Sequence, residues 1–452
     1  MFPRTYPWLA ALALGGAAAL AGAHEGPLDT RFGDGGMRHY GFQSVAGGNM
    51  DRAIVACSAA NGTLTVVGRA SSDRRIVTMR LLRDGSLDTN FSDDGKESFD
   101  LPGSVAHFVP GLCQTDGHMV VARPLTAPDG EQNVQIFRVL KQTGLPDPGF
   151  GSGGVVVVDL DQWIPGLGSE EMPLGVNALP NGDIAVSGRT TRAAGGERGF
   201  VILLAADGQI RRVAVLDNVR SRTAMTTVEA PDGRLWVFGQ NGRVAGAYRA
   251  TLNRETLAWE TVLEQLPLPG ETIWVGAGRA VDAQTVVLAV SAGPSPAYDG
   301  RPELVIFRAD TVSVLALPPA QLDGDSLWIT SRWGDHGVTV LPQRRVLYAA
   351  PARQLGTGGG VGVHFAMAEI GSTAGGDRVE SSFGINGAQT AAFRPDNGNC
   401  VGAEHRLGRL TLWGTEPVFV GSVNANCIVG GAGDDYLVAR IEVDPIFADG
   451  FD

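Results

Sequence analysis

Gly430–Val438 combines residue types and a spacing that could bind a metal ion. The stretch matches the calcium-binding nonapeptide G-G-x-G-x-D-x-U-x, in which U is apolar, at each defined place. Such repeats bind Ca²⁺ because carboxylates and carbonyls of successive turns surround one ion. Here the pattern occurs in a single copy, so the neighbouring turn that would complete the shell is missing. We therefore interpret Asp434 and Asp435, like Asp93 and Asp94, as solvated turn carboxylates.

The other candidate residues for chemistry lack the spacing that a site requires. Gly356–Gly362 is glycine-rich but has neither the G-x-G-x-x-G frame nor a following helix, so we expect a loop between strands. The seven histidines show no ligand spacing, and His118 is expected to face outward from a strand. No G-x-S-x-G nucleophile turn occurs. The sequence predicts no catalytic residue, no cofactor-binding residue and no metal ligand.

Five tryptophans could form a stacking platform for sugars or could pack between strands. We expect packing, because aromatic side chains contribute most of the buried area in such cores. The five are Trp236, Trp274, Trp328, Trp333 and Trp413.

Composition limits the class of protein that could position any site. The chain has 452 residues and a formal net charge of −12, with Lys+Arg 36 against Asp+Glu 48. This acidic balance and the lack of a basic run argue against nucleic-acid binding. Glycine accounts for 63 residues, which indicates many tight turns.

Residues 1–23 have the features of a secretory signal peptide. Arg4 precedes an apolar stretch from Trp8 to Leu20, and Ala21–Ala23 resembles a cleavage site with small residues. We expect a mature chain that begins at His24, with an uncleaved membrane anchor as the alternative. No later segment is long and apolar enough to cross a bilayer. The expected location is the periplasm or the exterior, with attachment to the cell surface as a further alternative.

Export makes disulfide bonds possible for the four cysteines. Cys57 and Cys113 occupy similar places in successive repeats, and Cys400 and Cys427 both lie in the last repeat. We favour these two pairs and leave the other pairings open.

A recurring segment, here called the Leu-Asp segment, reveals internal repeats. It occurs at Leu28–Gly36, within Arg83–Lys96 and at Leu145–Gly154, and its leucines are 59 and 58 residues apart. Each copy combines apolar Leu and Phe anchors with glycine-rich turns that accept positive φ values. A fixed period of this size indicates one structural unit that is repeated.

A turn followed by an alternating strand fixes the number of units. The apolar residues two and four places after each turn have the period of a half-buried strand. The mean spacing of the turns is about 58 residues, and the second turn residue is Gly62, Gly117, Gly182, Gly233, Gln284, Arg344 or Gly408. Each unit offers one strand before the turn, two after it and one after the Leu-Asp segment, of which Val155–Leu160 is the clearest example.

The units resemble the delta-60 repeat family of exported bacterial proteins. The resemblance is carried by Asn61–Gly68, Ile76–Arg80 and Asp84–Phe91, and it is best over residues 28–154 and 408–450. It implies a repeat fold of the propeller type. It implies no assigned activity and no site residues.

We therefore predict an all-β protein, a seven-bladed β-propeller of four-stranded repeats of about 58 residues. The copy of the Leu-Asp segment at Leu28–Gly36 precedes the first complete unit, so residues 28–42 are expected to complete the last blade and close the ring. The alternative is an open β-solenoid in which this copy caps one end. Residues 24–452 form a single domain in this interpretation, with blades near 43–100, 101–160, 172–216, 222–265, 272–317, 327–393 and 398–452.

Repeats without a recognisable reaction centre favour a binding function. We expect a monomeric, non-enzymatic propeller that recognises a protein or a glycan through loops on one face. The alternative is a hydrolase or lyase with its active site at the mouth of the central channel. Asp444–Asp452 could be a short surface-sorting tail or the last copy of the Leu-Asp segment, and both interpretations stay open.

Overall fold

The computed structural model describes the greater part of the chain from residue 28 to residue 442. The described residues are 28–33, 35–42, 51–70, 75–102, 109–192, 195–216, 223–240, 246–266, 268, 272–293, 299–322, 325–326, 328–330, 337–353, 360–384, 386–391, 406–424 and 434–442. The predicted signal peptide, the C-terminal tail and the Cys400–Cys427 pair lie outside these residues. Within the described ranges, no helix combines the length and the apolar character that crossing a membrane requires.

The described secondary structure consists of strands and three short 3-10 turns. The first half contains β1 (Met37–Tyr40), β2 (Arg52–Ser58), β3 (Leu64–Ala70), β4 (Arg75–Leu81), β5 (Lys96–Asp100), β6 (Gly111–Cys113), β7 (Met119–Thr126), β8 (Gln132–Val139), β9 (Val155–Val158), η1 (Leu160–Gln162), β10 (Leu167–Ala178), β11 (Ile184–Arg192), β12 (Glu197–Leu204), β13 (Ile210–Val215), β14 (Thr223–Glu229), β15 (Leu235–Gln240), β16 (Ala247–Leu252) and β17 (Trp259–Gln265). The second half contains β18 (Thr272–Asp282), β19 (Thr285–Gly293), β20 (Asp299–Phe307), β21 (Val312–Ala316), β22 (Gln321–Leu322), β23 (Asp325–Ser326), β24 (Trp328–Thr330), β25 (Gly337–Leu341), η2 (Pro342–Arg344), β26 (Arg345–Arg353), β27 (Gly360–Glu369), η3 (Ala374–Gly376), β28 (Arg378–Val379), β29 (Ala388–Ala391), β30 (Arg406–Trp413), β31 (Glu416–Asn424) and β32 (Asp434–Arg440).

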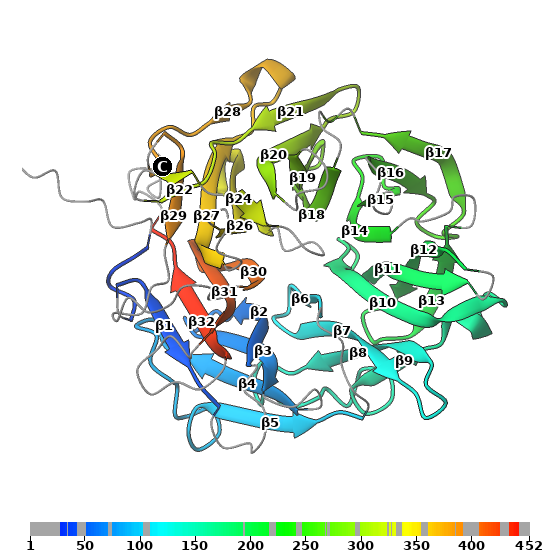
Figure 1. Ribbon diagram of the computed structural model, residues 1–452. Helices are drawn as coiled ribbons and strands as arrows, with labels where there is room; N and C mark the ends of the chain where they lie inside the picture. Colours follow the sequence, from blue (N-terminus) through cyan, green and yellow to red (C-terminus); the bar gives the residue numbers. More distant parts are fainter. Residues whose placement is uncertain are drawn as a thin grey trace, which may run out of the picture.

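Successive strands form antiparallel meanders that are arranged around a ring (Figure 1). β2 to β5, β6 to β9, β10 to β13, β14 to β17 and β18 to β21 each pair in chain order. β25, β26 and β27 follow, and both β28 and β29 pair with β27. One parallel pair, Glu170 with Gln132, joins β10 to β8, and β24 lies between β20 and β26. The prediction of an all-β propeller is confirmed.

The first strands of the meanders contact one another around the inside of the ring. β2 contacts β6, and the succession of contacts continues through β10, β14, β18, β25 and β30. β30 in turn contacts β2. The described strands therefore close into a ring, and the open solenoid is excluded.

The chain start completes the sheet of the chain end, as predicted. β1 pairs antiparallel with β32, in the order β1-β32-β31-β30, and Tyr40 lies opposite Tyr436. The bridge between Leu28 and Ile441 extends this pairing. Because β1 covers the edge of β32, this sheet does not offer β32 as a template for further strands.

The Leu-Asp segment is held against the third strand of its meander by an ion pair and a cation–π contact, and this arrangement is called the clasp below. Asp88 accepts from Arg80 Nε at 2.7 Å, and the Arg80 guanidinium lies 4.7 Å from the centre of the Phe91 ring. The second meander repeats this arrangement, since Arg138 pairs with Asp147 and lies over the ring of Phe150. Pro146, rather than Leu145, takes the first apolar place there, because Pro146 bridges to Val139.

At the chain start, the same clasp joins the two ends of the described chain. Asp29 pairs with Arg440 at 2.8 Å, and the Arg440 guanidinium lies 5.2 Å from the centre of the Phe32 ring. Burial disfavours the Asp29 carboxylate, but hydrogen bonds from Arg31 and the charges of Arg440 and Arg31 together lower its pKa. The Asp in this segment is therefore a structural residue that holds neighbouring strands together.

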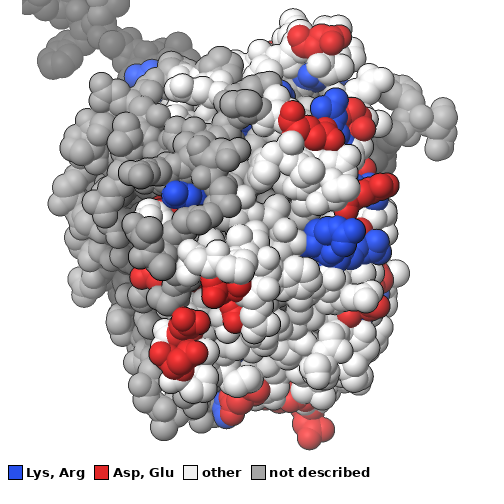
Figure 2. Space-filling view, turned by 90° about the vertical axis from the view of Figure 1, so that its right-hand side faces the viewer, with Lys and Arg blue, Asp and Glu red and all other residues white. Residues whose placement is uncertain are grey.

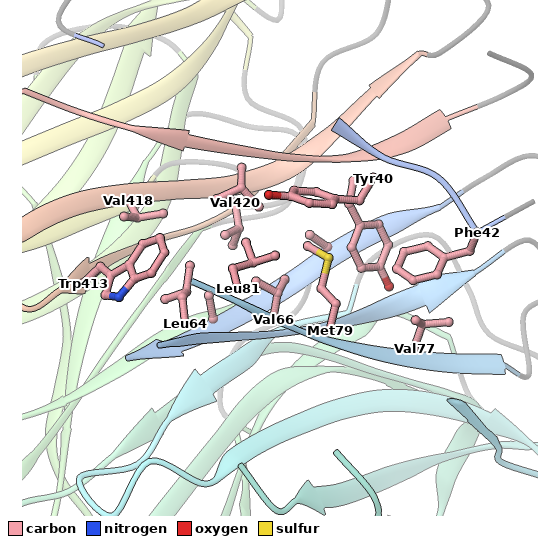
Figure 3. Close-up of a cluster of buried hydrophobic side chains, with 14 of the residues drawn as sticks. Tyr40, Phe42, Leu64, Val66, Val77, Met79, Leu81, Trp413, Val418 and Val420 are labelled. Carbon is pink, nitrogen blue, oxygen red and sulfur yellow. The ribbon is translucent and has the colours of Figure 1, made fainter. Parts of the chain in front are cut away.

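One apolar cluster packs between the meander β2–β5 and the sheet that contains β1 (Figure 3). Leu64, Val66 and Met79 face Val418, Val420 and Trp413 across the interface. Trp413 is fully buried, and its indole N–H donates to Gly62 O at 2.9 Å. Trp236 is also buried and lies against Phe238 and Phe307. For these two tryptophans, the prediction of packing between strands is confirmed.

The turn that we predicted for the last unit was wrong. Gly408 lies inside β30, and the turn that leads to the second strand is formed by Gly414 and Thr415. Leu410 and Leu412 therefore belong to the first strand of this sheet and not to the second. The alternation of apolar residues in β30 imitates the pattern of the second strands, which explains the error.

The structure also corrects the predicted positions of His118 and of two carboxylates. His118 lies just before β7, in a turn where its backbone N–H donates to Asp116 Oδ1 at 2.9 Å. Asp434 and Asp435 open β32 and pair with Asn424 and Val423, so they are strand residues. Asp94 does lie in a turn, where its carboxylate accepts the Lys96 N–H at 2.9 Å.

His364 is a buried histidine between the meander β18–β21 and its neighbour. Its ring nitrogens lie 3.0 Å from Pro318 O and 3.3 Å from Thr390 Oγ1. Burial lowers the pKa of His364 from 6.5 to about 4. Between pH 6.5 and about pH 4, the unfolded chain therefore binds a proton at His364 that the folded chain does not bind.

We expect the free energy of unfolding to fall by about 2–3 kcal/mol between pH 7.5 and pH 4.5 because of His364. The sign follows from the lowered pKa, since protonation below pH 6.5 favours the unfolded chain. Urea unfolding of the wild type and of H364Q at both pH values measures this contribution. The loss should be smaller in H364Q, whereas H118Q should behave as the wild type does. An equal loss in wild type and H364Q would contradict the prediction.

Candidate functional site

A polar network lies among the first strands near the middle of the ring. Asn177 on β10 is buried, and its Nδ2 donates to Thr226 Oγ1 of β14 at 3.1 Å. Thr227 Oγ1 lies 3.5 Å from the same nitrogen. The network therefore joins the inner strands of two adjacent meanders through side chains.

Arg279 on β18 extends this network past β14. Its Nη1 donates to Asn177 Oδ1 at 3.0 Å and to Gly278 O at 2.7 Å. This hydrogen bond joins β18 to β10, two first strands that both contact β14. The side chain is half-buried, and loss of hydration lowers its pKa to about 10.

Arg409 on β30 brings a second guanidinium to this part of the ring. Its side chain is half-buried. Loss of hydration, followed by the positive charge of Arg279, lowers its pKa well below the usual value. In the part of the chain that the structure describes, no carboxylate contributes to the pKa of either arginine. Arg409 is therefore a second arginine on a first strand, and its environment disfavours its charge.

Surface arginines of the same meanders are neutralised by neighbours. Arg254 pairs with Glu229 at 2.9 Å, and Arg211 pairs with Asp183 at 3.1 Å. On the right-hand side of the molecule as seen in Figure 1, acidic and basic side chains lie close together (Figure 2).

Irregularities in the first strands direct these side chains. The register shifts between Val275 and Gly278 before Arg279, and between Leu407 and Arg409 in β30. A bulge changes the direction in which a side chain points and is common beside functional sites. Packing also favours glycine at position 278, since a Cβ at this position would lie 2.7 Å from Val228 Cγ2.

The sequence analysis did not identify these residues. Asn177, Thr226, Thr227 and Arg279 have no regular spacing in the sequence and come together only when the strands pack around the ring. The dipeptide Gly-Arg occurs at 278–279 and at 408–409 in first strands, but it also occurs in second strands at 68–69 and 188–189, so it does not mark the inner strands.

Glu171 is a buried acid that could suggest acid–base chemistry, but its contacts are structural. Its Oε1 accepts the Leu160 N–H at 2.8 Å, and burial raises its pKa to about 8. The residue is 2% exposed, so a substrate has no access to it. Among the described residues, no group of three or more His, Cys, Asp or Glu side chains could hold a metal ion.

A disulfide bond joins Cys57 to Cys113, as favoured from the sequence. The two residues belong to β2 and β6, which are first strands of neighbouring meanders. The bond therefore fixes the distance between two strands beside the ring centre.

Comparison with known proteins supports the fold and leaves the activity open. Residues 59–91 match the family model described as "Domain of unknown function (DUF5122) beta-propeller". This is a β-propeller repeat protein. The match lies in the first meander and ends at Phe91, the residue whose ring contacts the Arg80 guanidinium. No curated protein matches the chain.

Several solved structures resemble the chain at low sequence identity. A polysaccharide lyase, the PL25 ulvan lyase, is 10% identical with a TM-score of 0.48, covering 90% of this chain and 96% of the lyase. Puromycin hydrolase is 17% identical with a TM-score of 0.44, covering 82% of this chain and 50% of the hydrolase. The Trypanosoma rangeli sialidase is 9% identical with a TM-score of 0.44, covering 90% of this chain and 59% of the sialidase.

Proposed function

We propose that this chain is an exported, monomeric seven-bladed β-propeller of the delta-60 type that binds a glycan or protein partner. The closed succession of first strands from β2 to β30 supports the count of seven blades. The N-terminal sequence supports export to the periplasm or the exterior. Binding would occur at the ring centre and through the loops beside it.

The observation that carries the proposal is the polar network of Asn177, Thr226, Thr227 and Arg279. It places two hydroxyls and a guanidinium within hydrogen-bond distance of the Asn177 amide, and these groups come from three first strands. Arg279 is the half-buried member of this network, and guanidinium donors of this kind bind the hydroxyl and carbonyl groups of a ligand. Glycoside hydrolysis commonly requires a pair of carboxyl groups, whereas this network consists of amide, hydroxyl and guanidinium groups, which supports binding rather than hydrolysis.

We expect N177A to weaken ligand binding by roughly tenfold, because Asn177 is the hub that orients Arg279 and both threonines. The full exported chain is screened on a broad glycan array and in pull-downs, and the affinity for each retained ligand is then measured. N253A serves as the matched control, since Asn253 caps an outer turn between β16 and β17.

Two results would contradict the proposed function. One is a chain that retains no ligand across the panel. The other is turnover of a glycan or ester substrate that N177A abolishes, which would establish an enzyme instead.

A further inference from the structure

We infer that Asn386 is a site of spontaneous deamidation, and that the reaction loosens the pairing of β29 with β27. Asn386 precedes Gly387 in the turn that leads to β29. Glycine has no Cβ, so its backbone nitrogen can approach the side chain of a preceding asparagine more closely than the nitrogen of another residue can. The modification changes the covalent state of the chain and is independent of any ligand.

The reaction needs only water as a co-reactant. The backbone nitrogen of Gly387 loses its proton and attacks Cγ of the Asn386 side chain. A carbon–nitrogen bond forms, the Nδ2 group leaves as ammonia, and a succinimide ring closes. Water then opens the ring at one of its two carbonyl groups. The product is aspartate or isoaspartate at position 386, and either product adds one negative charge.

Two Asn-Gly pairs in the described part of the chain are protected by hydrogen bonds. Gly62 N–H donates to Ala59 O at 3.0 Å, and Gly182 N–H donates to Leu179 O at 2.9 Å. The asparagine Oδ1 of each pair also accepts the N–H two residues later, at 3.2 Å in both turns. These bonds must break before the glycine nitrogen can attack, which slows the reaction.

The third pair, Asn386 with Gly387, lacks this protection. Among the described residues, none accepts a hydrogen bond from the Gly387 N–H, and none bonds to the Asn386 side chain, which is exposed. Two further pairs, at 241–242 and 397–398, lie outside the described residues. Of the three pairs that the structure describes, Asn386 with Gly387 is therefore the one whose reacting groups are free.

The turn at Asn386 has the form of a Leu-Asp segment, so the other copies allow a direct comparison. Phe383 N–H donates to Glu380 O at 3.1 Å, as the corresponding phenylalanine does in the other copies. At the chain start and in the second meander, the glycine equivalent to Gly387 donates to the phenylalanine oxygen four residues earlier, at 2.9 Å. These glycines are Gly36 and Gly154. The structure gives Gly387 no such bond, so its nitrogen is available for attack.

The backbone conformation of Asn386 also favours departure from the turn. Its φ is 55°, in the left-handed region, where the other two copies have Gly35 at 61° and Gly153 at 62°. A Cβ makes this conformation less favourable than it is for glycine, although asparagine adopts it more readily than most residues do. The chain can therefore leave this conformation at low cost for the geometry in which the nitrogen reaches Cγ.

Isoaspartate at position 386 disturbs the contacts of Gly387, because the main chain then passes through the former side-chain carbons and becomes one atom longer. Gly387 O accepts the Met367 N–H at 3.0 Å, and Ala388 pairs with Ala366 of β27. A Cβ at Gly387 would lie 2.1 Å from Val379 Cγ1, so the chain has little room to shift here. The pairing of β29 with β27 should therefore loosen.

The altered turn also contacts the cluster that joins the two ends of the described chain. Phe383 is 7% exposed and belongs to the apolar cluster that contains Leu28 and Ile441. Leu28 and Ile441 form the bridge between the chain start and the last sheet. The effect of isoaspartate should extend from β29 to this bridge and should leave the meander β14–β17 unchanged.

Peptide mapping by mass spectrometry tests the site, with samples of the full chain taken during incubation at mildly alkaline pH. Asn386 should deamidate roughly tenfold faster than Asn61 and Asn181, because those two turns must first break hydrogen bonds. In concentrated urea the three pairs should react at similar rates, since the turns are unfolded there. N386Q should stay unmodified over the same period, because glutamine has to close a larger ring.

Hydrogen exchange tests the structural consequence. Aged wild-type protein that contains isoaspartate should exchange faster at Met367 and in β29 than fresh protein does. Aged N386Q should keep the protection of the fresh protein. N386D reproduces the added charge on an unaltered main chain and should also keep this protection.

Equal rates at Asn386, Asn61 and Asn181 in the folded chain would overturn the assignment of the site. A preference for Asn386 that persists unchanged in urea would show that the local sequence sets the rate, and the role of the fold would be lost. Fast deamidation without a change of exchange in β29 would overturn the structural consequence. If N386D exchanges as fast as the aged wild type, the charge loosens β29 and the longer main chain does not.

Discussion

Deletion of residues 28–42 is expected to lower the free energy of unfolding by on the order of 5 kcal/mol or more. The segment contributes Phe32 (0% exposed), Tyr40 (6%) and Phe42 (8%) to the cluster between the first and last sheets. Removal of one buried aromatic side chain costs about 3–5 kcal/mol. The deletion also removes the ion pair of Asp29 with Arg440 and uncovers the edge of β32.

Hydrogen exchange locates the effect of this deletion. Exchange should rise first in β32, which loses the β1 neighbour, and at the end of β30, where Trp413 loses its contact with Phe32. Asp84–Gly85 should follow, because Tyr40 Oη donates to Gly85 O at 2.5 Å. Meander β14–β17 on the far side of the ring should keep its protection. Unchanged exchange in β32 would contradict the role of β1 in closure.

A pair of single substitutions provides the matched control for closure. D29N weakens the clasp between the two ends of the described chain, whereas D88N weakens the same clasp within one meander. We expect D29N to raise exchange near Arg440 and D88N to raise it near Arg80. Equal exchange patterns in the two variants would show that the Asp29 clasp has no special role in joining the ends.

The Leu-Asp segment allowed ring closure to be predicted because its chemistry is local and repeated. Asp88 and Phe91 meet Arg80 within one short stretch, so the same residue types at Asp29 and Phe32 require an arginine partner. That partner is Arg440, at the far end of the described chain. The contact that is local at Asp88 is therefore a contact between the two ends of the described chain at Asp29. The number of blades stays a prediction that the strand contacts support.

The candidate site could not be predicted in the same way because its residues belong to different repeats. Arg279 and Asn177 are brought together by the curvature of the ring and by bulges in β18 and β10. Neither the curvature nor the bulges follow from an alternating apolar pattern. The error at Gly408 has a related cause, since apolar alternation in β30 is compatible with either of two strand assignments.

Loss of the Cys57–Cys113 disulfide should lower the free energy of unfolding by about 4 kcal/mol, the value expected from chain entropy for this separation of 56 residues. C57A/C113A removes the bond and leaves a small apolar side chain at the buried position 57 and at the half-buried position 113. Chemical unfolding of the variant and of the wild type is measured with and without a reductant. The reductant is the control, because it breaks the Cys57–Cys113 bond in the wild type and should remove the difference between the two proteins.

The bond should matter most at β6, because this first strand has only the three residues Gly111–Cys113 within the described chain. It pairs with β7 through three residue pairs, whereas β10 pairs with β11 along most of its length. Its place in the ring therefore depends on the bond to β2 and on close packing, since a Cβ at Gly111 would lie 3.0 Å from Val55. We expect exchange in C57A/C113A to rise first in β6 and β7. If protection there is retained and stability falls by less than about 1 kcal/mol, packing between β2 and β6 holds this junction without the disulfide.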